Sequence, residues 1–543
     1  MGDAVRQTYS LGAYLPDVEK ALADIRNRDL ISRVWRKDHT VWKPDPKEIA
    51  NRLGWLGITE QMHEQISAIQ AFGRDVRDSG YRTVVLLGMG GSSLGPEVLR
   101  RTFGSAGGYP ELLVLDSTVP SWVRAVTEHI EPAKTVFLVS SKSGTTVEPR
   151  YLLSHFRSLV EQAVGAGRVG EHFVAVTDPG TPLAKMAEAD GFRQAFLNAS
   201  DIGGRYSVLS YFGLVPAALM GLEVTRLLSR ADDMRKACAS HVPDHDNPGV
   251  RLGAAMGSLA LRGRDKLTIM TSPGIASFGL WVEQLIAEST GKEGKGIVPV
   301  AGEPLLGVRH YGDDRLFVYL RMEGDDNDTL DGMVEQLQSA GQPVVTLPLQ
   351  DKYDLGAEFF RWEFATAIAG AIIGIHPFDQ PNVQAAKDAT ERVLQEYSST
   401  GSLPERPSDH ALSDVLRRPL PGKYLAIMAY IHESEGVEAA IADLRRQISE
   451  GYGIATTFGY GPRFLHSTGQ LHKGGPDNGL FLQILERHDP DISIPGEPYS
   501  FGVVADAQAL GDYQALRSLG RKVVGVRLDR GDEAGVRAIA DQL

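Results

Sequence analysis

Short runs of apolar residues, separated by helical or turn-forming stretches, dominate the chain from about residue 80 onward. In the first half these runs are Thr83–Leu87, Leu112–Leu115, Thr135–Val139, Phe173–Val176 and one near Phe192–Leu197. In the second half they are Leu267–Thr271, Leu316–Leu320, Val344–Leu347, Tyr424–Tyr430, Ile454–Phe458 and Leu480–Leu485, with Phe501–Val504 and Val523–Val526 as further candidate strands. Continuous apolar strands that alternate with helices are typical of parallel sheets covered on both faces, so the pattern predicts an α/β fold.

The same pattern predicts how the chain is divided. Residues 1–75 carry apolar side chains at three- and four-residue spacing, which predicts a helical N-terminal segment. We expect a first α/β domain at 76–230, a helical connector at 231–265, and a second α/β domain with a C-terminal α/β extension at 266–543. The segment Ser398–Pro421 contains four prolines and several serines, which favours a long surface loop.

Composition narrows the function. The 543 residues include 56 Lys+Arg and 69 Asp+Glu, a net charge of −13, which argues against a nucleic-acid or anionic-membrane binder. Cys238 is the only cysteine, so an intrachain disulfide and a Cys-rich zinc site are excluded. The N-terminus lacks the apolar core of a signal peptide. The most apolar window, Ala365–Ile375, is too short to span a bilayer and indicates a buried helix. We therefore expect a cytoplasmic protein without a membrane partner.

The first glycine-rich segment is Gly88–Pro96, which follows the first predicted strand. Glycines let a backbone approach a ligand, and the next helix offers its N–H groups to an anion. The segment also resembles a dinucleotide-binding fingerprint, with Asp116 after the next strand, but Ser93 stands where that fingerprint has Gly or Ala. The segment therefore predicts either an anion site or a tight turn.

The segment Ser140–Glu148 places five hydroxyls, one ammonium and one glycine between a strand and a helix. Phosphate oxygens accept several hydrogen bonds each, and short hydroxyls and helix-start amides supply them without bulk. Helix capping would account for one or two of the hydroxyls but hardly for five. We therefore predict a phosphate site here.

Arg205 follows two glycines, which would let its guanidinium approach an oxygen pair closely, although a structural salt bridge is the alternative. Glu288 lies beside an apolar stripe on a predicted helix over 280–290, whereas Glu283 points nearly the opposite way. A carboxylate in apolar surroundings suits a general base, and an ordinary amphipathic helix is the alternative.

Gln380 and Lys387 are seven residues apart, and Pro381 suits a helix start. That spacing predicts that both lie on one helix face, where both could reach one polyol. A capped surface helix with a solvated lysine is the alternative.

Together these segments resemble the glucose-6-phosphate isomerase family, whose members contain two sugar-isomerase (SIS) domains. The matching segments are Gly88–Pro96, Ser141–Thr146, Gly203–Ser207, Glu288–Lys292 and Phe378–Lys387. The C-terminal sequence resembles the isomerase module of fusions between a transaldolase and such an isomerase; we expect no transaldolase half here.

The resemblance implies a role for each matching residue. Glu288 would carry a proton between C1 and C2 through a cis-enediolate, and Arg205 would stabilise the charge that develops. Gln380 and Lys387 would contact the sugar, and Lys387 would assist ring opening. The residues expected to bind the substrate phosphate are Gly91, Ser92, Ser141, Lys142, Ser143, Thr145 and Thr146. No metal and no cofactor are expected.

The histidine that opens the ring is harder to assign. The segment Leu465–Gln470 resembles the His-x3-Gln helix of the family. In the usual enzymes that helix precedes the Gln…Lys helix, whereas here it follows Lys387. We choose His466 and keep His472 and His376 as alternatives. Family members are commonly homodimers that borrow a histidine across the interface, so a homodimer is expected.

The implied activity is the reversible isomerisation of D-glucose 6-phosphate to D-fructose 6-phosphate in glycolysis and gluconeogenesis. One alternative is a dual-specificity enzyme that also isomerises mannose 6-phosphate. Another is a non-catalytic SIS module that senses sugar phosphates, which would need the phosphate loop but not Glu288, Arg205 and Lys387 together. A nicotinamide dehydrogenase is disfavoured by Ser93.

Overall fold

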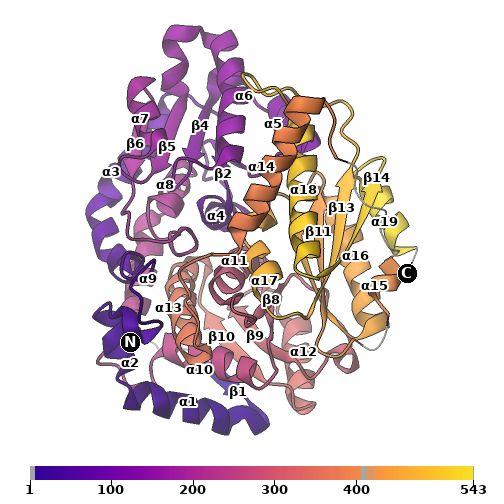
Figure 1. Cartoon of the computed structure of the whole chain (residues 1–543). Coiled ribbons are helices and arrows are strands. Elements are labelled where there is room, and N and C mark those ends of the chain that lie inside the picture. Colours follow the sequence, from indigo (N-terminus) through magenta and orange to yellow (C-terminus); the bar gives the residue numbers. More distant parts are fainter. Residues whose placement is uncertain (1–6, 405–411, 418–419, 542) are drawn as a thin grey trace.

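The computed structural model describes residues 7–404, 412–417, 420–541 and 543. Its fold is α/β, with three sheets of mainly parallel strands flanked by helices (Figure 1). The predicted fold class is confirmed, and the C-terminal extension forms the third of these sheets.

The first sheet is wholly parallel and has the order β3-β2-β4-β5-β6. Its strands are β2 (Thr83–Gly88), β3 (Glu111–Leu115), β4 (Thr135–Ser140), β5 (Phe173–Thr177) and β6 (Gln194–Leu197). The chain adds β3 on one side of β2 and β4 on the other. Ligands of open parallel sheets bind beyond the carboxyl ends of the strands at such a reversal, which here is where the segments after β2 and β4 lie.

The second sheet has the order β1-β10-β9-β7-β8. Its strands are β7 (Lys266–Thr271), β8 (Val298–Ala301), β9 (Arg315–Met322), β10 (Val344–Leu349) and the antiparallel edge strand β1 (Thr8–Ser10). The sequence did not predict β1 or β8. Both are short edge strands, and β8 contains Pro299, so only pairing with a neighbour identifies them.

The third sheet is wholly parallel, with the order β12-β11-β13-β14. Its strands are β11 (Tyr424–Tyr430), β12 (Ala455–Tyr460), β13 (Gly479–Glu486) and β14 (Lys522–Leu528). The predicted strand at Phe501–Val504 is wrong, because these residues begin helix α18 (Phe501–Ser518). Ser500 caps that helix by accepting a hydrogen bond from the Val503 amide at 3.3 Å. Helix α18 packs along α14 (Val383–Thr400), which masks its helical periodicity (Figure 1).

The predicted N-terminal helical segment and the connector are both helical. The apolar window Ala365–Ile375 lies largely in the buried helix α13, and no helix among the described residues has the length and apolarity to span a bilayer. The predicted loop Ser398–Pro421 begins in α14 and contains α15, and 405–411 and 418–419 lie outside the described residues. The helices not yet bounded are α1 (Leu15–Asn27), α2 (Leu30–Trp35), α3 (Ile58–Asp78), α4 (Leu94–Phe103), α5 (Pro120–His129), α6 (Val147–Val164), α7 (Pro182–Ala189), α8 (Tyr211–Leu219), α9 (Val224–Ala237), α10 (Pro248–Leu261), α11 (Phe278–Thr290), α12 (Asp328–Ser339), α13 (Leu355–Ile373), α15 (Leu412–Val415), α16 (Glu435–Tyr452), α17 (Gly469–Gly474) and α19 (Glu533–Ala540).

Alternate residues of the first sheet face two different cores. Val84 and Leu86 of β2 pack into a core shared with the N-terminal helices and the second sheet. Val85 and Leu87 pack into a core shared with the third sheet. Because successive side chains of a strand point to opposite faces, one strand joins both cores. The first sheet therefore packs against both other sheets, which also contact each other through β8 and β12.

Candidate active site

Glu288 and Arg205 meet inside the protein. Glu288 lies in the last turn of α11, and Arg205 lies in the 3₁₀ turn Gly204–Tyr206 that follows the first sheet. The distance from Arg205 Nη1 to Glu288 Oε1 is 3.5 Å. The guanidinium is buried and also donates to Ser289 Oγ at 2.8 Å and to Gln380 Oε1 at 3.1 Å. The arginine is therefore held rigidly beside the carboxylate.

Helix α11 is not an ordinary amphipathic helix, because all of its residues except Leu280 are buried. Glu283 is buried as well, contrary to the expectation that it faces away from the apolar side. Burial raises the pKa of Glu283 to about 8, while Arg445 opposes that shift. The reason is that α11 packs against its own sheet, α13 and α17 at once, so no face is left for solvent.

His466 pairs with Glu148, a carboxylate on a helix that flanks the first sheet. It ends the 3₁₀ turn Arg463–His466, and its Nε2 lies 2.9 Å from Glu148 Oε1 on α6. Gln508 Nε2 donates to the same oxygen at 2.7 Å. Burial disfavours the charged form of Glu148, but His466 and Lys387 outweigh it, so the pKa of Glu148 lies below its usual value.

A glutamine connects this pair to Glu288. Gln284 lies one helical turn before Glu288, and its Nε2 donates to Glu288 Oε2 at 3.1 Å. The same nitrogen donates to the backbone carbonyl of His466 at 2.8 Å. One side chain thus links the carboxylate on α11 to the turn that carries the histidine.

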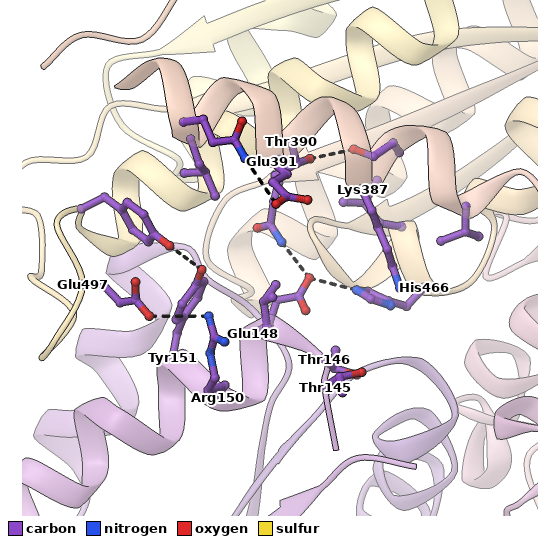
Figure 2. Close-up of a pocket in the computed structure, with 18 of the residues that line it drawn as sticks. Thr145, Thr146, Glu148, Arg150, Tyr151, Lys387, Thr390, Glu391, His466 and Glu497 are labelled. Atoms are coloured by element: carbon purple, nitrogen blue, oxygen red, sulfur yellow. Dashed lines mark hydrogen bonds and ion pairs between the residues drawn. The ribbon is translucent and has the colours of Figure 1, made fainter. Parts of the chain in front are cut away.

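A cavity of about 710 Å³ opens beside His466 and Glu148. It lies between the start of α6, the face of α14 and the segment before α18 (Figure 2). Figure 2 shows Lys387 reaching from α14 toward His466. The predicted site residues among those that line the cavity are Ser143, Thr145, Thr146, Lys387 and His466. Glu288, Arg205 and Gln380 are not among the described residues that line it.

The predicted phosphate loop forms the floor of this cavity. Ser141 Oγ donates to Thr146 Oγ1 at 3.2 Å, and Ser143 Oγ lies 2.9 Å from Thr145 Oγ1. Gly144 has a φ of +64°, which favours glycine and brings the hydroxyls together. The Lys142 ammonium instead pairs with Asp178 and donates to the Ser200 carbonyl at 3.2 Å. Ser143, Thr145 and Thr146 therefore line the cavity, whereas Ser141 and Lys142 do not.

The glycines of the segment after β2 serve close packing. A Cβ on Gly91 would lie 2.0 Å from the Gly204 carbonyl oxygen, and one on Gly90 would lie 2.7 Å from the His466 carbonyl oxygen. Neither Gly91 nor Ser92 is among the described residues that line the cavity. Their predicted contact with phosphate stays a prediction.

Asp116 has a structural partner, which removes the main support for a dinucleotide site. It is buried and accepts two hydrogen bonds from Arg463, both at 2.8 Å. Ser93 Oγ donates to the same carboxylate at 2.8 Å. Its oxygens are therefore engaged and do not face a ribose.

The prediction that Gln380 and Lys387 share one helix face is wrong. Helix α14 begins only at Val383, and the amide of the preceding Asn382 donates to Gln470 Oε1 at 2.9 Å. Gln380 lies in the preceding loop on Arg205, whereas Lys387 lies on α14 at the cavity. The two residues thus belong to two neighbouring parts of the site.

The alternative histidines have structural surroundings. His472 is buried between Phe464 and Phe481, and burial holds its pKa well below the usual value. His376 Nε2 lies 3.1 Å from the Lys47 carbonyl, and its Nδ1 accepts from the Phe378 amide at 3.1 Å. His466 is the only one of the three that lines the cavity.

Four residues of this region were not predicted: Glu148, Gln284, Lys292 and Gln508. Lys292 Nζ donates to the carbonyl and a carboxylate oxygen of Asp379, both at 2.6 Å. Burial, together with Arg205, lowers the pKa of Lys292 to about 8. The spacing of Gln284 four residues before Glu288 was a usable signal, whereas Gln508 lies 360 residues from Glu148 and had none. Within the described residues, no three His, Cys, Asp or Glu side chains are grouped as a metal site requires.

The phosphoglucose isomerase family model matches residues 37–297. The match covers just under half of the chain. It is 28% identical to the glucose-6-phosphate isomerase of Staphylococcus haemolyticus over 380 residues, which is 62% of this chain and 85% of that protein. It is 28% identical to the Enterococcus faecalis enzyme of the same name over 383 residues, with the same coverage.

Solved structures share the fold. A glucose-6-phosphate isomerase from Chlamydia trachomatis superposes with a TM-score of 0.61 at 19% identity, covering 70% of this chain and 86% of that one. A hypothetical protein from Thermus thermophilus superposes with a TM-score of 0.60 at 24% identity, covering 71% and 99%. The family match includes Arg205, Glu288 and the phosphate loop but ends before Lys387 and His466.

Proposed function

We propose that this chain is a member of the phosphoglucose isomerase family and interconverts D-glucose 6-phosphate and D-fructose 6-phosphate. The curated relatives carry that activity in their names. The observation that carries the proposal is the buried pair of Glu288 and Arg205, linked through Gln284 to the turn that bears His466. This arrangement supplies one carboxylate, one fixed cation and one imidazole, which are the groups that aldose–ketose isomerisation needs.

The substrate phosphate binds at the cavity floor. Ser143, Thr145 and Thr146 offer hydroxyls there, and Ser141 supports Thr146 through a hydrogen bond. The first amides of α6 add hydrogen-bond donors and the positive end of the helix dipole. The residues that hold the phosphate are thus neutral donors, which fits a chain whose overall charge is negative.

Ring opening is assigned to His466 and Lys387. With His466 Nε2–H donating to Glu148, its Nδ1 carries the lone pair and takes the proton of the ring hydroxyl. Lys387 approaches the same place from α14 and donates to the ring oxygen as the bond breaks (Figure 2). The lowered pKa of Glu148 keeps this carboxylate ionised, so it stabilises the imidazolium that forms.

Proton transfer is assigned to Glu288. The carboxylate removes the proton from C2 of the open aldose and returns it to C1, which passes through a cis-enediolate. Arg205 lies beside it and stabilises the negative charge. Its Nε donates to Ser289 and its Nη2 to the carbonyls of Pro377 and Asp379, so the guanidinium needs no reorganisation. Positioned acid–base groups contribute on the order of 10²–10⁴-fold each.

The direct test is a coupled assay on the purified full chain. Fructose 6-phosphate is supplied, and the glucose 6-phosphate formed is oxidised by a dehydrogenase; mannose 6-phosphate is offered in parallel. We expect turnover of fructose 6-phosphate in the range of about 1–10³ s⁻¹ that is typical of enzymes. Binding of fructose 6-phosphate without turnover would instead support the sugar-phosphate sensor.

A further inference from the structure

The 3₁₀ turn that carries His466 belongs to the third sheet but docks on the first. It follows β12, and its Arg463 forms a bidentate ion pair with Asp116, the residue just after β3. Both side chains are buried, with 7% and 0% of their surfaces exposed. A planar pair with two parallel hydrogen bonds fixes orientation as well as distance.

Further contacts lock the same turn from other sides. The Arg463 guanidinium lies over the rings of Trp122 and Tyr460, and the His466 carbonyl accepts from Gln284 on α11. Gly90 lies so close that a Cβ there would meet the His466 carbonyl at 2.7 Å. Residues of both the first and the second α/β units therefore contact the turn, which follows a strand of the third sheet.

We propose that Asp116 and Arg463 are positioning residues that hold His466 of the same chain over the active site, so that one chain supplies the complete set of acid–base groups. This inference rests on the proposed isomerase function. It makes the homodimer implied by the family resemblance unnecessary for a complete site. The altered segment order has a physical consequence here, because a histidine that follows α14 in the chain reaches Glu148 without a second subunit.

The first test mixes two inactive chains. Differently tagged Glu288→Gln and His466→Ala are co-expressed, and any species that carries both tags is isolated by two affinity steps. A site built in one chain leaves that species no more active than the parents. A site shared between two chains restores one intact site of two, or about half of the wild-type rate, and would overturn the proposal. An active wild type that forms no mixed species also supports it.

The second test removes the ion pair. Asp116→Leu combined with Arg463→Met deletes both charges, since a lone buried charge would unfold the site. We expect kcat to fall at least about tenfold with KM changed less than about threefold, because the acid–base groups are displaced while the phosphate contacts remain. The matched control is Glu358→Gln combined with Arg361→Met, which removes a buried pair on α13, away from the site, without leaving a lone charge; it should leave kcat unchanged. An unchanged kcat in the double variant would overturn the positioning role, as would changes of equal size in kcat and KM.

A readout without turnover separates this inference from the proposed function. The imidazole Nε2–H of His466 is observed by NMR in the wild type and in the double variant, and its exchange with solvent is measured. We expect faster exchange in the double variant, because the hydrogen bond to Glu148 is lost once the turn is released. An inactive wild type that shows this difference defeats the proposed function alone, whereas identical exchange in the two proteins defeats the positioning proposal.

Discussion

His466 Nε2 lies 2.9 Å from Glu148 Oε1, although 318 residues separate the two in the chain. Glu148 starts a helix of the first sheet, and His466 follows a strand of the third. The pair therefore forms only when two sheets dock. The packing of the third sheet against the first therefore decides whether His466 reaches its carboxylate partner.

Replacing Glu288 by glutamine should abolish turnover. The amide keeps the shape and the contact with Gln284 but cannot accept the C2 proton, so we expect kcat to fall by about 10³-fold or more. Binding of fructose 6-phosphate, measured by calorimetry, should stay within a few-fold of the wild type. Glu283→Gln on the same helix is the control and should keep activity; wild-type turnover in Glu288→Gln would contradict the proton-transfer role.

His466→Ala and Lys387→Ala should impair ring opening selectively. Both residues act before the open-chain sugar forms, so the cyclic hexose phosphate should lose more rate than an aldotetrose 4-phosphate, which cannot close a five- or six-membered ring. The measurement compares the loss of kcat/KM on hexose phosphate with the loss of solvent proton exchange at C2 of the tetrose. Equal losses on both substrates would remove the two residues from ring opening.

Replacing Thr146 by valine should weaken anion binding at the cavity floor. The substitution keeps the shape but deletes a hydroxyl, so the Kd for inorganic phosphate should rise by about three- to tenfold, or about 0.5–1.5 kcal/mol. Thr390→Val, on α14 at the other side of the cavity, is the control and should leave phosphate binding unchanged. Equal affinities in wild type and Thr146→Val would place the phosphate elsewhere.

Gly91→Ala should damage the fold around the site. Its Cβ would lie 2.0 Å from the Gly204 carbonyl oxygen, which is backbone and cannot rotate away. We expect a loss of about 1–3 kcal/mol in the free energy of unfolding, together with lower activity. Gly204→Ala is the matched control, because its Cβ would meet nothing within 4 Å. Denaturant titration of the two variants measures the difference.

The burial of Glu283 predicts a pH-dependent stability. Its folded pKa of about 8 lies above the ordinary value of 4.5, so the folded state retains a proton that the unfolded chain releases. The stability that the neutral Glu283 carboxyl contributes is fully present below about pH 4.5 and is lost as the pH rises toward 8. Glu283→Gln, which stays neutral, should therefore match the wild type near pH 4.5 and exceed it at pH 9 by on the order of a few kcal/mol. Parallel stability curves across this range would contradict the assignment.

Much of the fold follows from local sequence pattern. The strands of the first sheet were predicted because apolar runs with helical stretches between them have one common solution, a parallel sheet flanked by helices. The strand predicted at Phe501–Val504 is wrong because α18 is buried on several sides, so its apolar residues show no helical period. Strand β8 was missed because it is four residues long and contains Pro299.

The contacts of the candidate site are likewise of two kinds: those that local sequence predicts and those that depend on how the sheets pack. Residues close in the chain, such as the hydroxyls of 141–146 or Gln284 and Glu288, have a spacing that the sequence displays, because backbone geometry alone brings them together. The partners of His466 and Arg463 are decided by how the third sheet packs on the first, since that packing depends on many weak contacts spread over two cores. The sequence by itself thus determined the chemical groups and the loops that carry them, and only the tertiary structure decided which histidine meets which carboxylate.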